Sequence, residues 1–111
     1  MSEDCLVLNI WTKVSPVNSV ELKPVMFWIY GGALTGGSIY EPNYFGGLLA
    51  SYDVVLVAPN YRVGAFGFLY ANDSTTPGNV GFYDQNLALE WVSYLRTSIM
   101  LEIFTTVIIN F

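Results

Sequence analysis

Residues 24–40 read PVMFWIYGGALTGGSIY, an apolar run that ends abruptly at two pairs of glycines. The run Val25–Tyr30 has the composition of a buried strand, and Pro24 precedes it where a missing N–H does least harm. Gly31-Gly32 and Gly36-Gly37 follow. A glycine-rich turn after such a strand exposes backbone N–H groups that can hold a phosphate or the oxyanion of an ester transition state. The same turn can also be only a tight corner.

The phosphate interpretation of these glycines is the weaker one, because neither G-K-[ST] nor G-x-G-x-x-G accompanies them.

A chain of 111 residues forms one domain at most. With 53% hydrophobic and only 12% charged residues, it is too apolar to be disordered and rather apolar for a freestanding small module. Open sheet edges would also be a liability for such a module. The composition therefore indicates the interior of a larger protein.

Charge and residue types exclude several classes of function. The net charge is −5, and the four basic residues lie far apart, so we expect no nucleic-acid partner. The chain has no histidine, which excludes a Ser-His or Cys-His mechanism within it and removes the commonest zinc ligand. We therefore expect no metal and no cofactor. The apolar runs fall far short of the roughly 20 residues that span a bilayer, and the N-terminus does not resemble a signal peptide.

The pattern along the chain predicts an α/β arrangement. The β-branched run Asp53–Ala58 suits a strand covered on both faces, as in a largely parallel sheet. A helical segment between two such runs makes a βαβ unit. The predicted strands are residues 5–13, 25–30 and 53–58, and the predicted helices are residues 43–52 and 82–95. The hydrophobic stretch 97–111 could be a further strand and has the composition of an aggregation-prone segment.

Four stretches, taken together, resemble the type B carboxylesterase and cholinesterase family of α/β-hydrolases. Each is similar to one motif of that family, namely E-D-C-L-x-L-N-I, W-I-[HY]-G-G-G-x, N-Y-R-x-G-x-x-G-F and G-N-x-G-x-x-D-Q…A-L-x-W-V. In this chain they are residues 3–11, 28–34, 60–68 and 78–92. The resemblance implies an incomplete α/β-hydrolase fold, with part of a mixed central sheet and flanking helices. Its partner in the full-length parent would be a carboxylic ester substrate.

The resemblance assigns the glycine turn to the oxyanion hole of an ester hydrolase. The donors would be the backbone N–H groups of Gly32 and Ala33. Each preorganised donor contributes about 3–4 kcal/mol of transition-state stabilisation. Ala33 stands where the family has glycine, which keeps the N–H but adds a methyl group that narrows the nearby space. We expect this alanine to be tolerated only if its φ angle is negative.

Other residues have structural roles by the same resemblance. Cys5 resembles one half of a disulfide whose other cysteine lies upstream of this chain. Glu3 and Arg62 resemble a buried ion pair that ties the first motif to the third. Asp84 and Gln85 resemble helix-start and packing residues.

The family's nucleophile is the serine of a G-E-S-A-G elbow, which follows a helix and a further strand. No G-x-S-x-G occurs in this chain. We therefore expect residues 1–96 to be part of a carboxylesterase domain, residues 97–111 to be a tail foreign to the family, and the chain alone to be inactive. The alternative is a fragment of a non-catalytic, cholinesterase-like adhesion protein, which has the same fold without the serine.

Two features bear on the compartment. Members of the family are mostly secreted or membrane-anchored, and a single cysteine with an N-glycosylation sequon at Asn72 fits that context. We expect the full-length parent to be secreted or anchored, whereas this chain would stay in the cytosol as written.

Overall fold

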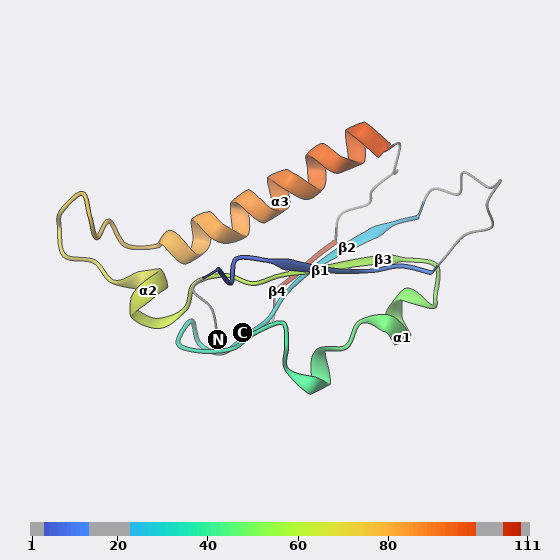
Figure 1. Ribbon diagram of the computed structural model, residues 1–111, viewed down its shortest axis with the longest axis horizontal. Helices are drawn as coiled ribbons and strands as arrows, with labels where there is room; N and C mark the ends of the chain where they lie inside the picture. Colours follow the sequence, from blue (N-terminus) through green and yellow to red (C-terminus); the bar gives the residue numbers. More distant parts are fainter. Residues whose placement is uncertain (1–3, 14–22, 100–105, 110–111) are drawn as a thin grey trace.

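A computed structural model describes residues 4–13, 23–99 and 106–109 of the chain. Its strands form one mixed sheet in the order β1-β3-β2-β4 (Figure 1). β1 pairs antiparallel with β3, whereas β2 runs parallel to both β3 and β4. The strands are β1 (Leu8–Trp11), β2 (Val25–Ile29), β3 (Val55–Pro59) and β4 (Thr106–Ile109). The helices are η1 (Pro42–Tyr44), α1 (Gly47–Ala50), α2 (Gly64–Phe68) and α3 (Val80–Ile99). A mixed sheet with helices confirms the predicted α/β class.

The central strands form where the apolar runs predict them. All five residues of β3 are buried, as expected of a strand with neighbours on both sides and cover on both faces. It begins at Val55 and not at Asp53, because Asp53 takes a positive φ of 61° in the preceding turn. In β2 the buried residues alternate with half-buried ones. The first strand is shorter than predicted, with only Leu8–Trp11 paired to β3.

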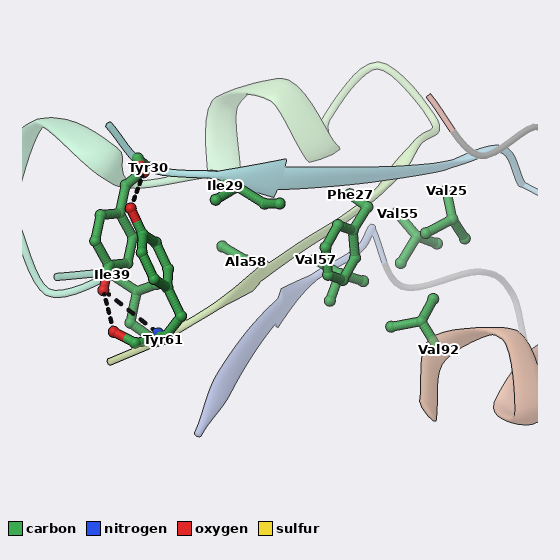
Figure 2. Packing of buried hydrophobic residues seen from close by; sticks show 10 residues of the cluster. All are labelled: Val25, Phe27, Ile29, Tyr30, Ile39, Val55, Val57, Ala58, Tyr61 and Val92. Carbon is green, nitrogen blue, oxygen red and sulfur yellow. Dashed lines mark hydrogen bonds between the residues drawn. The ribbon is translucent and has the colours of Figure 1, made fainter. Parts of the chain in front are cut away.

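The core lies between the sheet and α3, and Tyr30 and Tyr61 are at one end of it (Figure 2). Phe27 and Ala58 are completely buried at its centre, and α3 contributes Val92. Figure 1 shows α3 along one side of the sheet and α1 on the other. β2 and β3 are parallel, so the carboxyl end of β2 and the turn that follows it lie at the same end of the sheet as the carboxyl end of β3.

The segment between β2 and β3 departs from the single predicted helix over residues 43–52. It is divided into η1 and α1, with Gly46 between them. A side chain at Gly46 would collide with Leu56 and Trp11, so the backbone approaches the sheet closely there. The short helix α2 was not predicted, because its five residues include two glycines and show no helical period.

The last part of the chain contains a longer helix than predicted. α3 continues to Ile99 and so crosses the domain boundary expected at residue 96. Among the described residues of the tail, the expected strand is found at Thr106–Ile109, beside β2. Within the described ranges, no helix is both long and apolar enough to cross a bilayer.

Candidate functional site

The glycine turn, residues 31–37, follows β2 directly and is folded on the carbonyl of Gly32. That carbonyl oxygen accepts hydrogen bonds from the N–H and Oγ1 of Thr35, both at 2.9 Å, and from the N–H of Gly36 at 3.4 Å. The N–H groups of Gly32 and Ala33 donate no hydrogen bond to any part of the chain that the structure describes. Both residues are exposed. Two adjacent, unpaired donors of this kind can bind an anionic oxygen.

The backbone of this turn is left-handed over three residues. The φ angles are 138° at Gly32, 51° at Ala33 and 63° at Leu34. The condition expected for tolerating this alanine, a negative φ, is therefore not met. Its methyl group is carried in a conformation that costs an L-residue roughly 1–2 kcal/mol, because Cβ approaches the following carbonyl. At Gly32 a side chain would also collide with the carbonyl oxygen of Gly36, so only glycine fits.

Two tyrosines hold the base of the turn in the core. The hydroxyl of Tyr30 donates to the carbonyl of Tyr61, and the hydroxyl of Tyr61 donates to the carbonyl of Tyr30, each at 3.0 Å (Figure 2). Their rings stack with centroids 4.6 Å apart. Burial raises the pKa of both phenols, so the hydroxyls remain protonated donors at neutral pH. This clamp joins the residue before the turn to the residue two positions after β3.

The far side of the turn is held by the third motif as well. The N–H of Gly64, at the start of α2, donates to the carbonyl of Leu34 at 2.7 Å. The side chain of Asn60 accepts from the N–H of Ile39 and donates to the carbonyl of Cys5, both at 3.0 Å. Residues 60–64 therefore connect the first motif, the glycine turn and the chain beyond it.

Arg62 extends these connections to α3. Its Nε and Nη2 atoms donate to the carboxylate of Asp84 at 2.8 Å each, and its backbone N–H donates to the same carboxylate at 3.0 Å. The Asp84 side chain is only 7% exposed. Burial alone would raise its pKa, but the hydrogen bonds and charge of Arg62 outweigh this, and the pKa of Asp84 lies below its usual value.

The role of Asp84 was missed in part, because the sequence indicated only a helix-start and packing residue. The sequence offered one indication that Asp84 could have a buried partner. Asp84 is on the same predicted helix as Leu87, Trp91 and Val92. Glu3 lies outside the described residues, so its predicted pairing with Arg62 stays a prediction. Gln85 is half-buried in α3.

A hollow of about 300 Å³ lies beside the glycine turn. It is bounded by the turn on one side and by the segment around η1 on the other. Its lining residues are Gly31, Gly32, Thr35, Gly36, Gly37, Glu41, Asn43 and Tyr44. A small organic group in this hollow could therefore lie against Gly32, whereas Ala33 is not among the residues that line it.

The remaining predicted positions lie apart from this hollow. Cys5 is exposed and, among the described residues, forms no disulfide. Asn72 is exposed in the connection between α2 and α3. Across residues 4–13, 23–99 and 106–109, no group of three histidine, cysteine, aspartate or glutamate residues is arranged to hold a metal ion.

Comparison with known proteins identifies the family. The model of the carboxylesterase family matches residues 1–95. Acetylcholinesterase of Danio rerio is 55% identical over 94 residues, which are 83% of this chain and 14% of that protein. Acetylcholinesterase of Gallus gallus is 53% identical over 95 residues, or 83% of this chain and 12% of that protein.

A third relative carries a broader name. Carboxylic ester hydrolase of Bombus ignitus is 50% identical over 90 residues, which are 81% of this chain and 16% of that protein. The chain thus spans less than a fifth of the length of these three relatives. The family match covers residues 1–95, which include all four motifs, and the chain belongs to the carboxylesterase family.

Proposed function

We propose that the glycine turn is the oxyanion hole of a carboxylic ester hydrolase, with the N–H groups of Gly32 and Ala33 as its donors. The observation that carries this proposal is the pair of unpaired, exposed N–H groups in the glycine turn, of which Gly32 lines a hollow of about 300 Å³. When a nucleophile attacks an ester, the carbonyl oxygen becomes negative. Donors already fixed in place stabilise that charge without reorganising, and each contributes about 3–4 kcal/mol to the transition state.

The connections described above account for how such donors stay in place. The Tyr30–Tyr61 clamp and the Gly64–Leu34 hydrogen bond hold the turn from two sides. The fixed backbone keeps both N–H groups available, although neither gains an internal partner. This sheet would be part of the central sheet of an α/β-hydrolase, with residues 1–96 in that domain and residues 97–111 foreign to the family, although α3 extends to Ile99 and β4 pairs with β2.

The nucleophile and the base of the reaction are not among these 111 residues. The sequence has no histidine and no G-x-S-x-G elbow, so we infer that the chain alone does not hydrolyse esters. The substrate is a carboxylic ester bound by the full-length parent. The parent would be secreted or membrane-anchored, where Cys5 could pair with a cysteine outside this chain.

The donor role of Ala33 can be tested in a chimera. Residues 4–95 would replace the matched stretch of Danio rerio acetylcholinesterase, and lactic acid would then replace Ala33 during translation. Lactic acid has the same methyl group but an oxygen in place of the N–H. We expect kcat for an aryl ester to fall about 10²–10³-fold, the usual effect of removing one oxyanion donor.

The matched control is the hydroxy analogue of leucine at Leu34, which removes the neighbouring N–H and leaves both proposed donors. Its kcat should stay close to that of the unmodified chimera. Equal losses at positions 33 and 34 would contradict the assignment. For the 111-residue chain alone, ester turnover that a serine-reactive inhibitor abolishes would overturn the inference of inactivity.

A further inference from the structure

Residues 70–77, here called the Asp73 loop, form a closed loop between α2 and α3. Tyr70 and Pro77 pair as an antiparallel bridge, and the N–H of Ala71 donates to the carbonyl of Thr76 at 3.1 Å. Gly78 is buried against the side chain of Tyr70 at the base of the loop. Figure 1 shows this connection projecting from the end of the molecule, away from the sheet. The loop is therefore a fixed structure that stands out into solvent.

Asn72 lies at the exposed tip of the Asp73 loop and begins the sequon Asn72-Asp73-Ser74. Its φ is 56°, a left-handed conformation that asparagine tolerates better than most residues. The hydroxyl of Tyr70 donates to Oδ1 of Asn72 at 2.7 Å, which fixes the orientation of the amide. The amide nitrogen Nδ2 has no hydrogen-bond partner among the described residues. The atom that would be modified is thus presented to solvent.

The middle residue of the sequon is held within the loop. Oδ1 of Asp73 accepts four hydrogen bonds, from the N–H and the hydroxyl of both Thr75 and Thr76, at 2.7–2.8 Å. These hydrogen bonds lower the pKa of Asp73 to about 2. Its carboxylate is therefore ionised at neutral pH and engaged in hydrogen bonds with Thr75 and Thr76. Ser74 is exposed, and its hydroxyl makes no hydrogen bond within the described part of the chain. The two side chains that define a sequon, Asn72 and Ser74, therefore remain accessible.

We propose that Asn72 is a site of N-linked glycosylation on the folded surface of the parent protein. The donor would be an oligosaccharide linked to a lipid diphosphate. Nδ2 of Asn72 forms a bond to C1 of the first sugar, while the bond from C1 to the diphosphate oxygen breaks. The electron pair of that bond leaves with the diphosphate, and one amide proton is released.

The surroundings of the loop fit a bulky, hydrophilic attachment. Three large apolar side chains near it are exposed, with Phe66 at 87%, Leu69 at 55% and Tyr70 at 65%. A glycan on Asn72 would shield this apolar surface from other proteins. The glycine turn is on a different loop, so the glycan would be attached whether or not the parent hydrolyses esters.

The test is secretion of the full 111-residue chain from eukaryotic cells behind a cleavable leader. Asn72 begins the only N-x-[ST] sequence in the chain, so we expect the mass of one glycan. An amidase that releases N-glycans should remove it and leave aspartate at position 72. Asn72→Gln and Ser74→Ala should each abolish the added mass, whereas Ser74→Thr should retain it because threonine also completes a sequon.

Asp73→Ser separates the sequon from the loop structure, since it removes the capping carboxylate and keeps Asn72 and Ser74. Glycosylation of this variant at Asn72 would be a second positive result, because the acceptor groups are unchanged. Secreted chain without added mass, in both the unmodified sequence and Ser74→Thr, would overturn the proposal. Added mass that persists in Asn72→Gln would do so as well.

Discussion

The glycine turn and the Asp73 loop are both exposed, and both contain residues with positive φ, yet their polar groups are satisfied in opposite ways. In the Asp73 loop one carboxylate oxygen accepts from two N–H groups and two hydroxyls of the same loop. In the glycine turn the N–H groups of Gly32 and Ala33 have no partner among the described residues. The turn has internal hydrogen bonds to the Gly32 carbonyl, but it is also held from outside, by Tyr61 and Gly64.

The difference shows what a backbone binding site requires. A loop that satisfies its own donors is stable by local hydrogen bonds, but it has no donors left for a ligand. A loop that leaves donors unpaired needs anchors elsewhere, and here these reach through Arg62 to Asp84 on α3. We therefore expect substitutions in and around the glycine turn to affect stability far more than substitutions in the Asp73 loop.

The largest effect is expected for Gly32→Ala. At φ 138° an alanine is strained, and its methyl group would collide with the carbonyl oxygen of Gly36. We expect the free energy of unfolding to fall by about 3 kcal/mol. Urea unfolding of the 111-residue chain, followed by tryptophan fluorescence, measures this change.

Gly36→Ala is the matched control within the same turn. A Cβ at Gly36 would meet no atom within 4 Å. Its φ is also not in the left-handed range that alanine disfavours. The substitution should leave the unfolding midpoint unchanged or raise stability by about 0.5 kcal/mol. Equal destabilisation by both substitutions would show that the turn is sensitive to any side chain and not to the geometry of Gly32.

Asp84→Asn should have the next largest effect, because it removes the charge that Arg62 binds. Hydrogen bonds to charged groups contribute about 1.5–3 kcal/mol, and the Arg62 side chain is 41% exposed, so we expect a loss of about 2 kcal/mol at pH 7. The pKa of Asp84 is lowered in the folded chain. Its contribution is therefore complete above the unfolded pKa of about 3.9 and is lost as the pH falls through the lower, folded value.

Unfolding measured from pH 7 down to pH 2 tests that dependence. The gap in stability between the unmodified chain and Asp84→Asn should be constant above about pH 5 and should close in acid. A gap that stays constant down to pH 2 would mean that Asp84 acts through packing and not through its charge.

Much of the fold could be predicted from local patterns. The run Val25–Tyr30 and the buried run that ends at Ala58 became adjacent parallel strands, because β-branched and aromatic residues bounded by turn residues leave few other choices. The division of the segment 43–52 could not be predicted. It depends on Gly46 lying against Trp11 and Leu56, which come from other parts of the chain.

The candidate site was predictable as a location but not as a geometry. The glycines after β2 indicated a turn with exposed donors, and the structure has one there. The sign of φ at Ala33 could not be read from the sequence, because it is imposed by the hydrogen bonds around Gly32 and by the Gly64–Leu34 contact. The pairing of Arg62 with Asp84 joins residues 22 positions apart and exists only once α3 has packed.

Ala33→Gly tests the strain directly and should have a smaller, favourable effect. Glycine avoids the roughly 1–2 kcal/mol cost of a left-handed alanine but loses about 0.4–1 kcal/mol through the freer unfolded chain. We expect a net gain of about 0.5–1 kcal/mol in urea unfolding. Asn72→Gly in the Asp73 loop is the comparison, and it should give no gain, because asparagine tolerates this conformation and its hydrogen bond with Tyr70 would be lost.

The smallest effect is expected for protonation of Asp73, which changes only the internal hydrogen bonds of the Asp73 loop. Four hydrogen bonds lower its pKa from 3.8 to about 2, so the capped form is favoured above the unfolded pKa and is lost as the pH falls through about 2. In an NMR titration, the Asp73 carboxyl carbon and the amide protons of Thr75 and Thr76 should share that midpoint. The amide protons of Gly32 and Ala33 should not follow it, because no carboxylate caps them. A midpoint near 3.8 for Asp73 would show that the cap does not persist in solution, and the contrast between a self-satisfied loop and an externally held turn would then fail.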